Sequence, residues 1–195
     1  MKTVVCLIGL SLFLLVSHHH FAYGKDSEEN METSQFTSKR ISRTSVITLQ
    51  APLKTVFPLF GPIKEKEWAS VWDPQIIYST TNLIEEHMVF KAKSHHGGHG
   101  EPDSIWTVSK YLPEQAFIEY TVFTPERLWW ITIQCREDIP NQTTRAEITY
   151  TATGLTDKGN AINKKFLQLM YAHDLKNWEE AINHYLKTGE KRKLH

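Results

Sequence analysis

The sequence predicts an α+β domain in which one curved antiparallel sheet is covered by one long helix near the C-terminus. Between residues 75 and 153, strand-like segments follow one another with only short turn sequences between them. Short connections of this kind join antiparallel neighbours. A segment without proline then runs from Asp157 to Leu186. A sheet and a helix with one apolar side each bury those sides against each other, which gives a layered domain.

The first strand is expected at residues 45–51, where SVITLQA is rich in β-branched residues and is ended by Pro52. Apolar residues at helical spacing in PLKTVFPLF then predict a short helix, and a second helical turn is expected at residues 63–68. The remaining six strands are expected at residues 75–80, 88–93, 104–112, 117–123, 127–137 and 145–153. In the last of them apolar and polar residues alternate, which indicates one covered and one wet face of the sheet.

The long helix is expected to begin after Thr156, whose side chain can cap it, with Asp157 in the first turn where the helix dipole favours negative charge. On a helical wheel its large apolar residues share one broad face. Asp174 falls in the middle of this face. An ionised carboxylate there costs several kcal/mol unless it is paired or hydrated. Asp174 is therefore expected either to bond a buried tyrosine or tryptophan donor or to line a ligand cavity as a polar anchor. His173 and Asn177, at the edge of this face, can join either arrangement.

Residues 1–24 are predicted to be a secretory signal peptide. The apolar run TVVCLIGLSLFLLVS is shorter than the roughly 20 residues of a membrane span, and Ala22 and Gly24 fit a small-residue cleavage site. An uncleaved anchor is the alternative. Residues 25–43 are polar and are expected to be a disordered lead-in. The folded domain is expected at residues 44–187, with a basic tail at residues 188–195. The protein is thus expected to be exported, periplasmic or secreted, with no stable membrane span after cleavage.

Charge and cysteine content argue against binding to nucleic acid and against an intrachain disulfide. Cleavage would remove Lys2, one of 22 basic residues, and none of the 22 acidic residues, so the net charge stays near zero. This balance does not favour binding to nucleic acid. Cleavage would also remove Cys6, so that Cys135 has no cysteine to pair with. A lone cysteine in an apolar strand is typical of a small core residue. No cofactor is predicted, and we expect a monomer or a weak dimer.

Three histidines, His95, His96 and His99, lie within SHHGGHGEPD, between two expected strands. Imidazoles beside a carboxylate suit zinc, copper or nickel. The glycines between them are typical of a turn, however, whereas a metal site needs a fixed geometry. The three histidines are therefore weak candidates for metal ligands, and the segment is interpreted as a long hairpin connection.

Several stretches resemble one known group of proteins. ITLQAPLKTVFPLFGPIKEKEW resembles the segment from strand one to the first helix of helix-grip proteins, often written aPxxvFxlF, through Pro52, Phe57 and Phe60. EWASVWDP resembles the signature E-x-x-W-x-x-x-W-x-P of one bacterial branch, and its matching residues are Trp68, Trp72, Asp73 and Pro74. IWTVSKYLPEQAFIEYTVFTP and NWEEAINHYL are similar to the same branch. Over residues 45–187 the chain is thus identified, by resemblance, as a member of the START-related polyketide cyclase/lipid-transfer superfamily (SRPBCC).

The resemblance implies a helix-grip fold, with a seven-stranded antiparallel sheet wrapped on the long C-terminal helix and two short helices after strand one. It also implies a deep apolar cavity that holds lipids, polyketides or aromatic metabolites. Large aromatic side chains fill cores, but they also build apolar pockets with a few polar groups. The residues expected to bind the ligand are Trp68, Trp72, Trp106, Tyr120, Trp130, Met170, Asp174 and Trp178.

The leading hypothesis is an exported, non-enzymatic binder or carrier of a small hydrophobic ligand. The alternative is an enzyme of the cyclase or dehydratase type, in which Asp174 or His173 acts as general acid or base. Catalytic members of the superfamily use different acid and base residues, so the resemblance implies no catalytic set. A metal binder built on the histidine-rich segment is the third hypothesis.

Overall fold

The computed structural model describes residues 36–92 and 104–193. Seven strands form one antiparallel sheet in the order β1-β7-β6-β5-β4-β3-β2. Their bounds are Arg40–Leu49 (β1), Pro74–Tyr78 (β2), Val89–Ala92 (β3), Ile105–Leu112 (β4), Phe117–Phe123 (β5), Arg127–Asp138 (β6) and Thr143–Gly154 (β7). Each strand of the sequence prediction is present; β5 has the predicted bounds, and the ends of the others are shifted by up to five residues.

Short helical turns separate β1 from β2. They are α1 (Leu53–Val56), the 3-10 helix η1 (Phe57–Phe60), which continues it directly, and the 3-10 helix η2 (Lys64–Glu67). A further 3-10 turn, η3 (Pro113–Gln115), joins β4 to β5. The two short helices expected after the first strand are thus confirmed, with η1 extending the first of them past Pro58.

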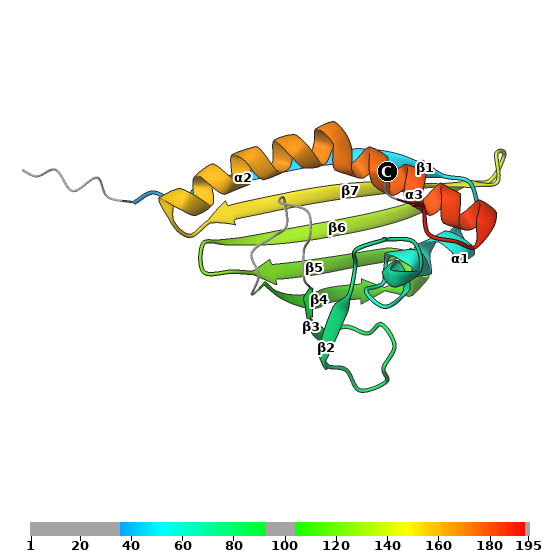
Figure 1. Cartoon of the computed structure of the whole chain (residues 1–195), viewed down its shortest axis with the longest axis horizontal. Helices are drawn as coiled ribbons and strands as arrows, with labels where there is room; N and C mark the ends of the chain where they lie inside the picture. Colours follow the sequence, from blue (N-terminus) through cyan, green and yellow to red (C-terminus); the bar gives the residue numbers. More distant parts are fainter. Residues whose placement is uncertain (1–35, 93–103, 194–195) are drawn as a thin grey trace, which may run out of the picture. The chain divides into compact units, whose positions relative to one another are not determined.

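The C-terminal helix consists of α2 (Asp157–Leu169), one π-helical turn, η4 (Met170–Asp174), and α3 (Leu175–Thr188). The Thr156 side chain accepts a hydrogen bond from the Gly159 N–H at 3.0 Å, which confirms the predicted cap. The helix ends at Gly189, whose φ of 73° is the left-handed conformation common after a helix. Figure 1 shows the whole helical segment lying over the sheet, and its contacts are with β1, β7 and β6.

Strand β1 begins at Arg40, so the boundary expected between lead-in and domain is wrong for Arg40–Arg43. The composition of this stretch is polar, yet its side chains are bonded on the open face of the sheet. Arg40 donates from Nε to Thr153 Oγ1 at 2.8 Å, and its guanidinium lies 5.0 Å from the centre of the Trp130 ring. Ser42 Oγ lies 2.8 Å from Thr151 Oγ1. An edge strand with one solvent-facing side needs few apolar residues, so the polar composition of this stretch did not reveal that it belongs to the sheet.

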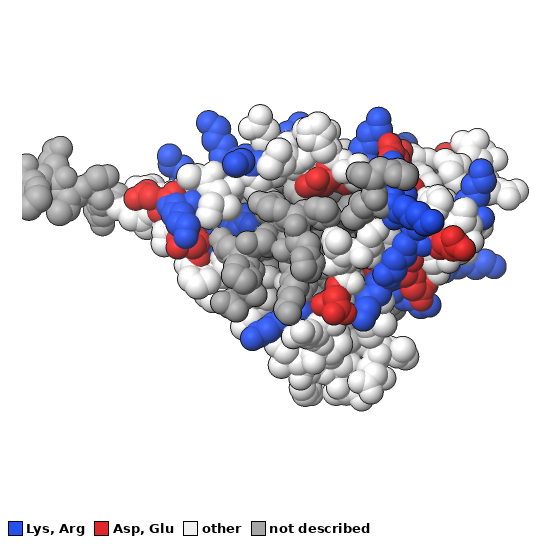
Figure 2. Space-filling model, viewed as in Figure 1, with Lys and Arg blue, Asp and Glu red and all other residues white. Residues whose placement is uncertain are grey.

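Side chains that face the helix make up a single apolar core, which includes residues of every strand except β2, of α1 and η1, and of the C-terminal helix. On the opposite, outer face the side chains are mostly polar or half-buried. Positive and negative side chains are interspersed on the face seen in Figure 2, without a large patch of one sign. In the described part of the chain, no helix combines the length and the apolar character that crossing a bilayer requires.

Candidate ligand site between the sheet and the C-terminal helix

The inner face of the sheet carries three successive rows of side chains, two residues apart along each strand. The first row is aromatic and contains Trp129, Val122, Trp106 and Phe90. The second row contains two tyrosines, in the order Tyr150, Ile131, Tyr120 and Val108. The third row is aliphatic and contains Ile148, Ile133 and Ile118. The middle row of the inner face therefore places hydroxyl groups within an otherwise apolar surface.

One tryptophan from outside the sheet packs on the aromatic row, and two others pack on each other. The Trp72 ring packs edge-on against Trp106, with ring centres 5.5 Å apart, and against Phe90 at 6.1 Å. Trp68 and Trp178 make a similar contact at 5.7 Å, which joins the turn after η2 to α3. Trp72 and Trp178 remain half-buried, whereas Trp68 and Trp106 are buried. These rings form an aromatic wall of the kind found around apolar ligands.

Two indole groups of this wall and the hydroxyl of Tyr120 donate to backbone carbonyl oxygens. The indole N–H of Trp68 donates to the Leu59 carbonyl oxygen at 2.8 Å, and that of Trp72 donates to the Pro62 carbonyl oxygen at 2.7 Å. The Tyr120 hydroxyl donates to the Phe60 carbonyl oxygen at 2.6 Å. The Tyr120 bond ties the segment between β1 and β2 to the sheet, whereas the two indole bonds hold parts of that segment together.

Glu65 enters the same interior from η2. In a 3-10 helix, residues three apart lie on one side, so Glu65 shares the side of the buried Trp68, while Lys64 and Lys66 are exposed. Burial raises the pKa of the Glu65 carboxyl to about 8. The pKa of Tyr120 and that of Tyr150 are raised first by burial and then by the charge of Glu65. The carboxyl group therefore lies on the side of the tyrosine row.

Asp174 reaches the tyrosine row from the opposite element. It is the last residue of the π-helical turn, and it is half-buried. Its charge is a further cause of the raised pKa of Tyr150, after burial, Glu65 and Tyr171. A π-helical turn inside an α-helix is rare and is frequent at functional sites. The inward placement expected from the helical wheel agrees with this position, whereas His173 and Asn177 are exposed.

Most of the residues expected to line the site lie on the inner side of the sheet: Trp68, Trp72, Trp106, Tyr120, Met170, Asp174 and Trp178. Trp130 does not. Successive residues of a strand point to opposite faces, and Trp129 is the fully buried member of the pair, so Trp130 lies on the outer face under Arg40. The inner residue is Trp129, whose Nε1 has no hydrogen-bond partner among the described residues.

Glu65 is the functional candidate that the sequence interpretation missed. It occupies the first position of the E-x-x-W-x-x-x-W-x-P stretch, three residues before Trp68. The surrounding KEKE has the composition of a solvated turn, which hides a single inward carboxyl. The three-residue spacing to an indole was the signal that pointed inward.

The metal hypothesis is untouched by the structure, because His95, His96 and His99 lie outside the described residues. Among the residues that are described, no group of three or more His, Cys, Asp or Glu side chains is arranged to hold a metal ion. Cys135 is buried and not in a disulfide, and burial raises the pKa of its thiol to about 12. A neutral buried thiol is a core residue and not a nucleophile, as the sequence predicted.

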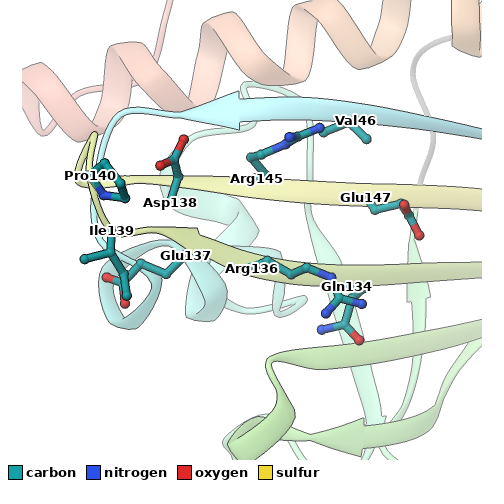
Figure 3. A pocket seen from close by; sticks show the side chains of 9 residues that line it. All are labelled: Val46, Gln134, Arg136, Glu137, Asp138, Ile139, Pro140, Arg145 and Glu147. Atoms are coloured by element: carbon teal, nitrogen blue, oxygen red, sulfur yellow. The ribbon is translucent and has the colours of Figure 1, made fainter.

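A separate hollow of about 460 Å³ lies on the outer face, beside the turn between β6 and β7 (Figure 3). Its lining is mostly charged or polar and includes Arg136 and Arg145, which lie opposite each other on β6 and β7. Sites for small apolar molecules are lined mainly by apolar and aromatic side chains. The inner site between the sheet and the helix is therefore the better candidate for a hydrophobic ligand.

No protein-family model matches the chain, and no curated protein is similar to it in sequence. Solved structures are similar in fold. Norcoclaurine synthase from Thalictrum flavum, in complex with dopamine and hydroxybenzaldehyde, has a TM-score of 0.57 at 9% identity, covering 93% of this chain and 100% of that one. Ara h 8.0201 has a TM-score of 0.55 at 11% identity, covering 78% and 99%. A conserved protein from Geobacillus kaustophilus has a TM-score of 0.57 at 16% identity, covering 76% and 97%. With the sheet order and the long C-terminal helix, these likenesses show that the chain has the helix-grip fold of the START-related polyketide cyclase/lipid-transfer superfamily.

Proposed function

We propose that this protein binds a small hydrophobic ligand, aromatic at least in part, between the inner face of the sheet and the C-terminal helix. The observation that carries the proposal is the combination of an aromatic wall with an inward carboxyl group, Glu65, beside two tyrosines. Ligand sites in proteins have this composition, since apolar walls provide affinity and a few polar groups fix the orientation.

A core that served stability alone would not retain such a group. Moving a carboxyl out of water costs free energy unless hydrogen bonds or an opposite charge compensate it. Glu65 lies in an interior of indole, phenol and aliphatic groups, and its raised pKa expresses that cost. A glutamine or a leucine would be cheaper there, so its presence supports a role in binding.

The fold likeness supports the same proposal by analogy. The Thalictrum flavum structure holds dopamine and hydroxybenzaldehyde, two small aromatic molecules with polar substituents. A shared fold does not transfer a ligand, because function belongs to the site and not to the fold. The aromatic row and the tyrosine row of this chain supply an independent reason to expect a ligand of that general kind.

The test is to purify the protein from its natural host, extract it with an organic solvent and identify co-purified small molecules by mass spectrometry. Trp72→Leu should reduce the amount of ligand recovered, because it removes a half-buried ring of the wall. Trp130→Leu is the matched control, since this half-buried indole lies on the outer face, and it should recover as much ligand as the wild type. Equal recovery from both variants, or no ligand from the wild type at saturating expression, contradicts the proposal.

An acid–base enzyme is the second candidate, favoured by one observation. Glu65 and Asp174 both act on the Tyr150 hydroxyl, so two carboxyl groups approach one tyrosine from η2 and from η4. General acid–base chemistry needs titratable groups around one reacting atom. A Glu65→Gln, Asp174→Asn double variant should then accumulate substrate in place of product. Adding wild-type protein to that extract should change the mass of a compound or exchange its protons in deuterated water; an unchanged extract rules out turnover.

Export completes the proposal: we infer that the protein works as a carrier outside the cytoplasm, after cleavage following Gly24. The support is the apolar run after Lys2 and the small residues at Ala22 and Gly24. Mass spectrometry of the protein from the fractionated host should give a chain that begins at Lys25. A chain that begins at Met1 and stays in the membrane fraction would favour the uncleaved anchor.

A further inference from the structure

The Glu65 carboxyl group lacks a hydrogen-bond partner among the described residues and is not fully enclosed. It makes no hydrogen bond or ion pair with any residue that the structure describes, although Lys64 next to it bonds Glu67 at 2.5 Å. Its oxygen atoms are not among the fully buried polar atoms that lack a hydrogen-bond partner, and the residue is half-buried. Because Glu65 is only half-buried, part of this residue keeps surface that solvent or a ligand can contact.

Three of the neighbouring donors already make hydrogen bonds within the protein. The Trp68 and Trp72 N–H groups and the Tyr120 hydroxyl proton all bond backbone carbonyl oxygens. A ligand oxygen near this end of the tyrosine row therefore cannot use them without breaking a structural bond. The carboxyl group of Glu65 makes no hydrogen bond with a described residue, so its proton can be donated to a ligand.

The charges around Glu65 favour its neutral form. Its charge acts on Tyr120 of β5 and on Tyr150 of β7, whose pKa values it raises, and Asp174 of η4 acts on the same Tyr150 hydroxyl. None of these supplies a positive charge, and the lysines on both sides of Glu65 point to solvent. With a pKa of about 8, the carboxyl holds its proton at pH 7. A neutral carboxylic acid in an apolar site is a hydrogen-bond donor.

We propose that Glu65 donates a hydrogen bond from its neutral carboxyl group to a carbonyl-type oxygen of the bound ligand. The ligand is thus an uncharged apolar molecule with an exposed oxygen acceptor, such as an aryl ketone, an aldehyde or a quinone. This inference rests on the proposed function, since it names the polar group by which the interior orients its ligand. An amine ligand would instead require the ionised carboxylate.

The test uses three probes of nearly equal shape: indane, 1-indanone and 1-aminoindane. Their dissociation constants are measured by NMR titration of the protein at pH 6 and pH 9.5. Wild-type protein should bind 1-indanone roughly threefold to tenfold more tightly than indane at pH 6, the ratio of one hydrogen bond. At pH 9.5 this preference should vanish, because the ionised carboxylate has no proton to donate.

Variants separate the carboxyl from its surroundings. Glu65→Gln should keep the preference for 1-indanone at both pH values, because the amide N–H still donates and does not titrate. Glu65→Leu should bind indane and 1-indanone alike at both pH values. Glu67→Gln is the matched control, since this nearby carboxylate is bonded to Lys64 and Tyr185, and it should behave as the wild type. The infrared carbonyl band of bound 1-indanone should lie at lower frequency in the wild type than in Glu65→Leu.

The outcomes distinguish the two proposals. If wild-type protein binds indane but shows no preference for 1-indanone at pH 6, or if Glu65→Leu keeps the preference, the role of Glu65 is overturned while the binding function stands. Tighter binding of 1-aminoindane than of 1-indanone also overturns it, in favour of an ionised carboxylate. If none of the probes binds, the binding function itself fails. Should Glu65→Leu not fold, the pH independence of Glu65→Gln remains decisive.

Discussion

Gly159 lies so close to the backbone of Glu126 that a Cβ atom at this position would come within 1.8 Å of the Glu126 carbonyl oxygen. The same carbonyl accepts a hydrogen bond from the Leu155 N–H at 2.8 Å, and the Glu126 side chain pairs with Lys158 at 3.3 Å. The first turn of α2 is thereby fixed on the turn between β5 and β6. This contact sets where the rest of the C-terminal helix, including Asp174, meets the sheet.

Gly159→Ala should therefore destabilise the protein. In an exposed helix, replacing glycine by alanine adds up to about 1 kcal/mol of stability. Here the new methyl group meets backbone that cannot move freely, and overpacking of this kind costs about 1–3 kcal/mol. Urea unfolding monitored by tryptophan fluorescence measures the difference. Gly189→Ala is the comparison, because a Cβ there meets nothing within 4 Å and only the left-handed conformation opposes it. A Gly159→Ala variant that is more stable than the wild type would show that the turn between β5 and β6 can move to make room for the methyl group.

Glu65 should make the protein less stable as the pH rises from about 4.5 to 8. In the unfolded chain its carboxyl loses the proton near 4.5, whereas the folded state keeps it up to about 8. Between these values the folded state binds more protons, so the free energy of unfolding falls with rising pH. At about 1.4 kcal/mol per pKa unit, the total is on the order of a few kcal/mol.

Glu65→Gln removes this dependence, so the variant should equal the wild type near pH 4.5 and exceed it in stability at pH 9. Urea unfolding at both pH values provides the measurement. Glu67→Gln should act in the opposite sense, because hydrogen bonds from Lys64 and Tyr185 lower the pKa of Glu67. Its carboxylate stabilises the fold above pH 4.5, and that contribution is lost as the pH falls. If the difference in unfolding free energy between the wild type and Glu65→Gln is the same at pH 5 and pH 8, the burial of this carboxyl is contradicted.

The fold was predictable because its signals are local and repeated. Alternation in β7, the turns between strands and the Thr156 cap each depend on a few neighbouring residues, and each is present in the structure. The start of β1 was not predictable in the same way. Arg40 and Ser42 are held by Thr153 and Thr151, more than a hundred residues away, and composition contains no trace of such partners.

The site was predictable only in part, for two physical reasons. Successive residues of a strand point to opposite faces, and the sequence does not show whether Trp129 or Trp130 points inward. The prediction named Trp130, whereas the inner residue is Trp129. Glu65 lies among three other charged residues, where a solvated turn is the ordinary interpretation. Asp174 was found because a lone carboxylate in a run of apolar helix positions is unusual enough to be noticed.

Cys135 should be unreactive in the native protein. The thiolate is the form that reacts with alkylating reagents and disulfides, and burial raises the pKa of this thiol to about 12. Ellman's reagent at pH 8 should therefore label native protein, purified without residues 1–24, very slowly, and should label it fully in 6 M guanidinium. Cys135→Ala gives the background. Rapid labelling without denaturant would mean that β6 opens readily or that the core around Cys135 is loose.

The bond from the Tyr120 hydroxyl to the Phe60 carbonyl should contribute measurably to stability. Tyr120→Phe keeps the ring on the floor of the site but leaves a buried carbonyl oxygen without this donor, which costs about 1–3 kcal/mol. Tyr111→Phe is the matched control. The Tyr111 ring stacks on Phe57 at 6.0 Å, and its hydroxyl makes no hydrogen bond with a described residue, so its loss should change stability by less than about 0.5 kcal/mol. Because the bond anchors η1, and η1 leads into η2, Tyr120→Phe should also accelerate amide exchange at Glu65 and Trp68. Exchange rates equal to those of wild type would show that η2 is held in place without this bond.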